Sequence, residues 1–150
     1  MGGRSVDRLA IILVLVLLFA AAWTGCGKKG DPLPPDMVLP VAAHDLRVLR
    51  QAEGVRISWV LPEKERNLHR VVIQRSEFET MLDRCPECPQ EYRILADLQL
   101  GDPRLDRTGG REMAYMDMDV RSGRLYMYRI LVCNSGGACS DASLPAEIKF

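Results

Sequence analysis

The strongest constraint on the fold of this chain is the side-chain pattern of residues 111–143. Within this stretch, Tyr126, Tyr128, Ile130 and Val132 recur at every second position. Successive side chains of a β-strand point to opposite faces, so this spacing places all four on one face of a strand. Aromatic and β-branched side chains also suit that conformation. No helical period fits the stretch, and it therefore predicts β-structure.

Turn signals bound this strand on both sides. Gly123 can take the positive φ that a tight turn needs, and Asn134 to Gly137 predict a hairpin loop. Seven short segments alternate in this way between turn signals: residues 46–48, 55–59, 70–76, 92–100, 112–120, 125–134 and 146–150. The polar residues 100–111 predict a surface loop. No amphipathic helix interrupts the segments, so they predict an all-β, seven-stranded antiparallel β-sandwich.

Composition narrows the range of partners. The 150 residues include 20 lysines and arginines and 20 aspartates and glutamates, so the formal net charge is zero. Domains that bind nucleic acid usually carry an excess of basic residues, and a nucleic-acid partner is therefore not expected. Apart from one cysteine pair, no residue pattern points to a cofactor, a bound metal or a small-molecule substrate. The length suits one domain preceded by a targeting segment.

Residues 1–25 predict an N-terminal hydrophobic signal helix. Arg4 and Arg8 precede an uncharged stretch, residues 9–23. That stretch is shorter than the ~20 apolar residues that a membrane-spanning helix needs. A basic start followed by a short apolar run is typical of a secretory signal peptide.

The residues that follow, Thr24, Gly25, Cys26 and Gly27, resemble a bacterial lipobox. The resemblance implies that the signal peptide is removed, and that Cys26 carries the lipid and begins the mature protein. Trp23 stands where a lipobox usually has leucine. The alternative is an uncleaved N-terminal anchor. With either anchor, the rest of the chain lies outside the cytoplasm.

Residues 26–42 predict a tether between the membrane and the domain. Their prolines and glycines favour a semi-extended segment that cannot build a core. The opening of this segment, CGKKGDPLPP, is similar to small outer-membrane lipoproteins that begin Cys-Gly-x-Lys-Gly-Pro, with Asp31 inserted here. That resemblance, with Gly27 rather than aspartate after the cysteine, implies a lipid anchor in the outer membrane and a domain that faces the periplasm.

Residues 43–150 resemble a fibronectin type III domain, which has an immunoglobulin-like fold. The matching residues are Trp59, Arg75, Tyr115, Met116, Asp117, Val120, Gly123, Tyr126, Met127, Tyr128, Arg129, Ile130, Asn134, Gly137, Ser140 and Ser143. The resemblance implies that Trp59 fills the core. It also implies that Tyr126 forms a tyrosine corner, with its hydroxyl bonded to the backbone of the preceding turn. We expect Tyr128 and Ile130 in the core as well.

Four cysteines remain once Cys26 is assigned to the lipid. In an exported domain, an even number of cysteines favours disulfides. Cys133 and Cys139 flank a glycine-containing hairpin loop, and we expect a disulfide between them.

Cys85 and Cys88 form a Cys-Pro-Glu-Cys motif in a predicted loop. Three interpretations remain open: a local disulfide, half of a zinc site, and a thiol redox pair. A zinc site would need Cys133 and Cys139 as its second half, and the sandwich places those at the opposite end. A redox pair normally begins a helix, whereas the sequence after Cys88 predicts a strand.

This sandwich fold serves many unrelated functions, so the fold alone does not identify one. The sequence contains no spacing typical of a catalytic triad or of paired carboxylates. We therefore expect a lipid-anchored, non-enzymatic envelope protein whose domain binds or assembles with another envelope protein. The alternative is an envelope thiol-redox or metal-binding protein that uses Cys85 and Cys88.

Overall fold

The computed structural model describes residues 38–63, 67–79 and 88–150, and this part of the chain is all β. Eight strands follow one another: β1 His44–Gln51, β2 Gly54–Val60, β3 Leu68–Phe78, β4 Arg93–Gln99, β5 Leu105–Gly109, β6 Glu112–Asp117, β7 Leu125–Asn134 and β8 Ala146–Lys149. The described residues include no helix with the length and apolar character needed to cross a membrane. The expected signal helix, residues 1–25, lies outside the described residues.

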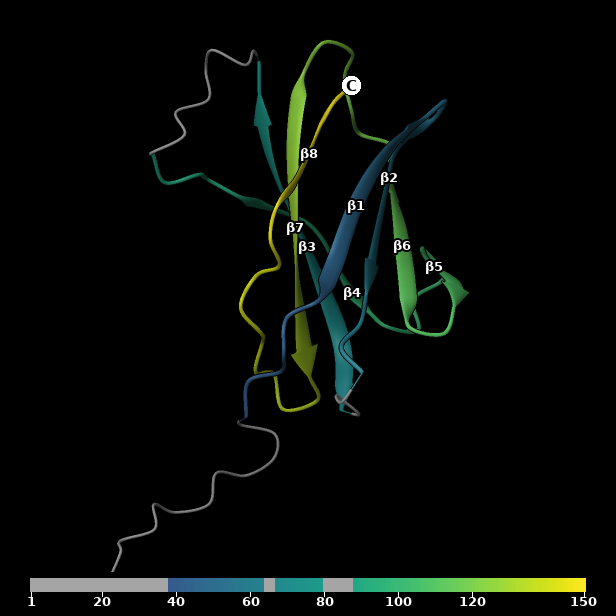
Figure 1. Cartoon of the computed structure of the whole chain (residues 1–150), viewed down its shortest axis with the longest axis vertical. Coiled ribbons are helices and arrows are strands. Elements are labelled where there is room, and N and C mark those ends of the chain that lie inside the picture. Colours follow the sequence, from purple (N-terminus) through teal and green to yellow (C-terminus); the bar gives the residue numbers. More distant parts are fainter. Residues whose placement is uncertain (1–37, 64–66, 80–87) are drawn as a thin grey trace, which may run out of the picture. The chain divides into compact units, whose positions relative to one another are not determined.

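The strands form two antiparallel sheets of four (Figure 1). One sheet has the order β1-β2-β6-β5, and the other has the order β4-β3-β7-β8. The chain therefore passes from one sheet to the other between β2 and β3, between β4 and β5, and between β6 and β7. Immunoglobulin constant domains have the same first sheet, and their second sheet corresponds to β3, β7 and β8. Strand β4 extends that second sheet by one strand.

The expectation of seven strands was wrong by one within the described residues. The additional strand, β5, lies in the stretch that was expected to be a surface loop. It pairs with β6 at the edge of its sheet. Of its side chains, Leu105 is buried, whereas Asp106 and Arg107 are exposed. An edge strand of this kind is stabilised by backbone pairing and shows little apolar alternation.

The core lies between the sheets, and each sheet contributes alternate side chains to it. Trp59 on β2 is fully buried, as are Tyr126, Tyr128 and Ile130 on β7. Ile73 on β3, the strand beside β7, packs into the same apolar cluster. The period-two pattern of the sequence therefore corresponds to the inward face of the central strands.

The segment before β1 packs against one end of the sandwich. The side-chain amide of Asn134, at the end of β7, donates to the carbonyl oxygen of Val38 at 3.1 Å. Pro40 and Ala43 are buried. The last residues of the expected tether and the first of the domain thus lie beside the loop that joins β7 to β8 (Figure 1). We call this the hairpin end of the sandwich.

The opposite end contains the turn between β6 and β7. Gly123 adopts a φ of 88° in that turn. Phe150, the last residue, exchanges backbone hydrogen bonds there: its N–H donates to Arg124 at 3.0 Å, and its carbonyl accepts from Gly123 at 2.6 Å. We call this the turn end. Strand β7 runs from the turn end to the hairpin end.

Gly54 marks a close approach between β2 and β6. A Cβ atom added there would overlap the carbonyl oxygen of Asp117. We expect Gly54→Ala to lower the free energy of unfolding by about 1–3 kcal/mol, because two paired strands would have to separate. Urea denaturation of the purified variant measures this loss.

Gly101→Ala is the matched control, because an added Cβ at Gly101 meets no atom within 4 Å. We expect its unfolding midpoint to equal or exceed that of the wild type. Equal stability of the two variants would contradict the role assigned to Gly54.

Candidate functional site

A buried carboxylate joins the two sheets at the turn end. The side chain of Asp117, on β6, is only 1% exposed. Arg75 on β3 donates to Asp117 Oδ2 at 2.9 Å, and the Tyr128 hydroxyl on β7 donates to the same oxygen at 2.8 Å. The amide of Asp119 donates to Asp117 Oδ1 at 3.0 Å. Both carboxylate oxygens are thus hydrogen-bonded, which offsets the cost of burying the charge.

Arg75 connects this buried group to the surface. Beyond Asp117, its guanidinium donates to the Asp119 carbonyl at 2.6 Å and to the Asp119 carboxylate at 3.3 Å. It also lies over the ring of Tyr126, 5.3 Å from the ring centroid. Burial disfavours the charged guanidinium, but hydrogen bonds and attraction from Asp117 and Asp119 outweigh that effect and raise the pKa of Arg75. The arginine therefore stays charged.

Two tyrosines near Asp117 are held in their neutral form. Burial, together with the negative charge of Asp117 and the hydrogen bond to it, raises the pKa of Tyr128 far above its ordinary value of 10.0. Burial and the same charge raise the pKa of Tyr115. A deprotonated Tyr128 could not donate to Asp117, so this hydroxyl serves as a fixed donor.

Tyr126 has the position that the resemblance implies. Its hydroxyl oxygen accepts the backbone N–H of Arg121 at 2.7 Å, in the turn between β6 and β7. The ring is fully buried and stacks on Tyr128, with the ring centroids 6.3 Å apart. The turn is therefore tied to β7 from within the core.

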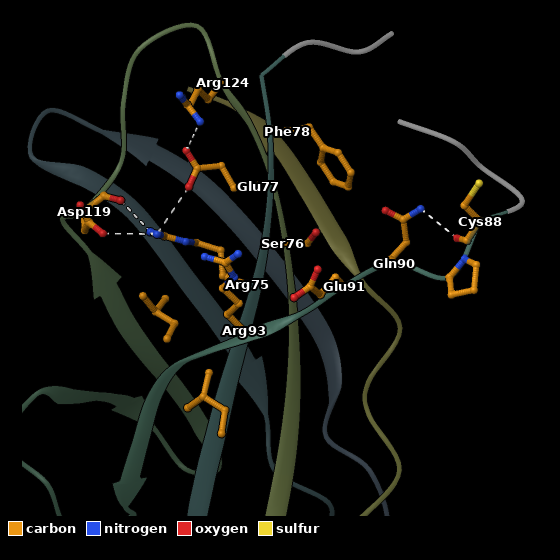
Figure 2. Close-up of a pocket in the computed structure, with 13 residues that line it drawn as sticks. Arg75, Ser76, Glu77, Phe78, Cys88, Gln90, Glu91, Arg93, Asp119 and Arg124 are labelled. Atoms are coloured by element: carbon orange, nitrogen blue, oxygen red, sulfur yellow. Dashed lines mark hydrogen bonds and ion pairs between the residues drawn. The ribbon is translucent and has the colours of Figure 1, made fainter. Parts of the chain in front are cut away.

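A pocket of about 740 Å³ opens beside this network. Its lining comes from the end of β3, the start of β4, the residues before β4 and the β6–β7 turn. Figure 2 shows Arg75, Glu77 and Asp119 on one side of β3, and Phe78 and Gln90 on the other.

Ion pairs connect residues that line the pocket. Arg124 donates to Glu77 at 2.7 Å and to Glu79 at 3.2 Å. Arg75 lies 3.8 Å from Glu77. Ile94 on β4 also lines the pocket and is 63% exposed. The pocket thus combines charged groups with an accessible apolar side chain.

The cysteines lie in different parts of the molecule. Cys133 and Cys139 form a disulfide across the hairpin, with an S–S distance of 2.08 Å. Cys88 is also disulfide-bonded, and it lines the pocket. Cys26 and Cys85 lie outside the described residues. Cys133 is at the hairpin end, and the pocket that Cys88 lines is at the turn end.

Within ranges 38–63, 67–79 and 88–150, no group of three or more His, Cys, Asp or Glu side chains is arranged to hold a metal ion. Several charged residues at the pocket form ion pairs, as Arg75 does with Asp117 and Arg124 does with Glu77.

Sequence reasoning missed the role of Asp117. A signal was present: Asp117 follows Met113 and Tyr115 at two-residue steps, on the face of β6 that turns inward. A charged residue at such a position requires a buried partner. The identity of that partner depends on which strands face each other, and Arg75 is 42 positions away in the sequence.

Comparison with solved structures supports the fold. The twitchin kinase region of C. elegans (Fn31-NL-kin-CRD-Ig26) is similar over 75% of this chain, with a TM-score of 0.50 and 16% identity. At that identity the likeness bears on the fold alone. The fold is a fibronectin-like β-sandwich.

Pectate lyase Pel3 from Pectobacterium carotovorum is also similar, over 65% of this chain, with a TM-score of 0.41 and 17% identity. The similar region spans only 17% of the twitchin structure and 25% of the lyase. No protein-family model and no curated protein matches the sequence.

We expect the pair of Asp117 and Arg75 to contribute to stability as a unit. Asp117→Asn and Arg75→Met should each lower the free energy of unfolding by about 3 kcal/mol, because each leaves a buried group without its partner. The stability loss of the double variant should be smaller than the sum of the two single losses, by at least about 1 kcal/mol. Denaturant titration of the four proteins measures this coupling.

The pair of Arg56 and Asp106 is the control, because its ions are also 2.9 Å apart but Asp106 is 66% exposed. Its coupling should stay below about 1 kcal/mol. A coupling for Arg75 and Asp117 no larger than this would contradict the structural role of Asp117.

Tyr128 should make the domain sensitive to alkali. Its pKa is raised in the folded state, so the stability that it contributes is complete below its ordinary pKa of 10.0 and is lost as the pH rises above that value. The urea concentration at the midpoint of unfolding of the wild type should therefore decrease as the pH rises from about 9 to 11. Tyr128→Phe should start lower at pH 7 and fall less steeply. Parallel pH profiles for the two proteins would show that Tyr128 is not the cause of the sensitivity to alkali.

Proposed function

We propose that this protein is a lipid-anchored, non-enzymatic component of the bacterial cell envelope, and that its β-sandwich is a protein-binding or assembly module. The short apolar segment, the Thr-Gly-Cys sequence that ends at Cys26 and the proline-rich residues after it support the anchor. The resemblance of residues 26–35 to small outer-membrane lipoproteins supports an anchor in the outer membrane, with the domain in the periplasm.

The observation that carries this proposal is the separation of the two ends of the sandwich. The chain enters at the hairpin end, where Asn134 bonds to Val38. The pocket opens at the turn end, beside Asp119 and Arg124. The ten residues of β7 span this separation, which corresponds to about 30 Å. An anchor at one end leaves the pocket at the other end accessible to a partner.

The absence of an enzymatic role is part of this proposal. Arg75, the most enclosed cation at the pocket, is held by Asp117 and Asp119. Tyr128 is committed as a hydrogen-bond donor in the same cluster. Side chains that are held in this way stabilise the wall of the pocket and fix the position of the exposed Asp119 carboxylate.

A second candidate is an envelope thiol-redox or metal-binding protein that uses Cys85 and Cys88. The observation that favours it is that Cys88 lines the pocket and is disulfide-bonded. The reduced form would offer a thiol at an accessible site. Insulin reduction by the purified protein, or stoichiometric zinc in it, would support this candidate. A protein inactive in both assays supports the binding module.

Cys26→Ser should abolish lipidation. Cells that express the wild type and are fed a palmitate analogue should yield a labelled protein in the outer-membrane fraction. Cells that express Cys26→Ser should yield unlabelled protein, since no thiol remains to be acylated. Cys88→Ser is the matched control and should stay labelled. A label on Cys26→Ser, or an intact residue 1–25 segment on the mature wild type, would contradict the proposed anchor.

The binding role is tested in intact cells with a photoreactive amino acid. Placed at Ile94, in the pocket, it should crosslink the anchored protein to a specific envelope protein. Placed at Leu144, which is 88% exposed, it serves as a control for random collision. Equal crosslinking from the two positions would count against a partner at the pocket.

A further inference from the structure

Exposed apolar side chains gather where the chain enters the sandwich. In the part of the chain that the structure describes, seven large apolar side chains are exposed. Four of them belong to the two segments that lead into β1 and β8: Val38, Leu39, Val41 and Leu144, with exposed fractions of 54%, 63%, 60% and 88%. The other three are dispersed, with Leu49 on β1, Ile94 on β4 and Met118 after β6.

The two segments lie on one side of the hairpin end. The first begins at Val38, whose carbonyl accepts from Asn134, and continues into β1. In the second, the N–H of Ser143 donates to Ile130, in the second half of β7, at 2.8 Å, and Leu144 follows. Strands β1 and β8, which the segments enter, lie next to each other at the edges of the two sheets (Figure 1). We use the name apolar corner for Val38, Leu39, Val41 and Leu144.

Buried neighbours hold the apolar corner in place. Pro40 and Ala43 are buried, and Ala43 belongs to the core cluster. In the other segment, the hydroxyl oxygen of Ser143 accepts the N–H of Ile130 at 3.0 Å. The exposed side chains therefore project from backbone that is already ordered. Such a surface loses little conformational entropy when it binds.

The length of the tether keeps the apolar corner near the membrane. Residues 27–37 separate Cys26, the proposed site of lipidation, from Val38. A chain of that length spans at most about 40 Å when it is fully extended. A short tether also gives the two surfaces that it joins a high effective concentration. Even a weak contact between the corner and the bilayer would therefore be populated.

The composition of the apolar corner suits lipid acyl chains better than charged headgroups. Residues 38–43 and 142–146 contain no charged side chain. Asp45 and Asp141, which follow the first segment and precede the second, are exposed and acidic, so they do not attract anionic lipids. The favourable contribution is burial of aliphatic side chains at the membrane surface, which grows with the apolar area that is buried.

We propose that the apolar corner inserts into the surface of the membrane that carries the lipid anchor, and that this contact orients the domain with its turn end away from the bilayer. The proposal rests on the proposed function, because the anchor brings the corner to the membrane, and it adds a second membrane contact. The pocket at the turn end would then face the aqueous space, where a partner protein can reach it.

Quenching of tryptophan fluorescence tests the proposal on the lipidated protein in phosphatidylcholine vesicles. Leu144→Trp places a tryptophan in the corner, and lipids that are brominated on their acyl chains quench a tryptophan that touches them. Ile94→Trp is the matched control, because Ile94 is 63% exposed and lines the pocket at the turn end. Brominated lipid should remove most of the added emission of Leu144→Trp and leave that of Ile94→Trp unchanged. Trp59 is fully buried and gives both proteins the same background.

A charge in the corner should release the domain from the bilayer. Leu39→Glu, combined with Leu144→Trp, should shift the equilibrium between inserted and released domains at least about tenfold toward the released form, because a buried apolar side chain is lost. The shift appears as recovered emission. Val41→Glu is a second variant in case Leu39→Glu affects folding. Met118→Glu is the matched control, since Met118 is 70% exposed and lies at the turn end, and it should keep the quenching.

Three results would overturn this proposal. They are equal quenching of Leu144→Trp and Ile94→Trp, undiminished quenching in both glutamate variants of the corner, and a blue-shifted emission of Leu144→Trp that brominated lipid does not quench. The last result would mean that protein, from the same chain or a second copy, covers the corner.

Failure of membrane insertion is distinguishable from failure of the proposed function. If only the insertion is wrong, Cys26 is still labelled by the palmitate analogue, the protein still sediments with the vesicles, and Ile94 still crosslinks to an envelope protein. If the anchor is wrong, the palmitate label on Cys26 is absent, whatever the fluorescence shows.

Discussion

The buried carboxylate of Asp117 is the interaction on which the turn end of the sandwich depends. It lies on one sheet and accepts hydrogen bonds from Arg75 and Tyr128 on the other. Removing a charge from water is costly, so the carboxylate is stable only if its donors are held in place. This requirement accounts for the positions of several neighbouring residues. Gly54 leaves room for the backbone of Asp117, and the amide of Asp119 completes the bonding as the chain enters the turn.

The two ends of the sandwich are stabilised by different means. At the hairpin end, a disulfide between Cys133 and Cys139 closes the loop, and Asn134 holds the incoming chain through Val38. At the turn end, stability comes from ion pairs and from the bond between Tyr126 and the backbone of Arg121. Charged groups are thus gathered at the end of the domain away from the incoming chain. This separation suits the proposed arrangement, in which the domain is anchored at one end and binds a partner at the other.

Strand β4 forms one edge of its sheet. Vacant strand edges are a hazard for a soluble domain, because they invite pairing with other chains. Here β4 is irregular where it meets Ile73 and Gln74, and such bulges limit pairing along an edge.

Part of this description follows from the sequence alone. Alternation of apolar side chains determined the inward faces of β2 and β7, because burial between two sheets requires a period of two. The lipobox-like residues around Cys26 and the spacing of Cys133 and Cys139 are local features, and they too can be read without a structure. Strand β5 could not be found in this way, since backbone pairing with β6 stabilises it and its side chains are mostly polar. The cluster around Asp117 was decided only by the tertiary structure. It depends on the register between strands that are far apart in the chain, and no local pattern encodes that register.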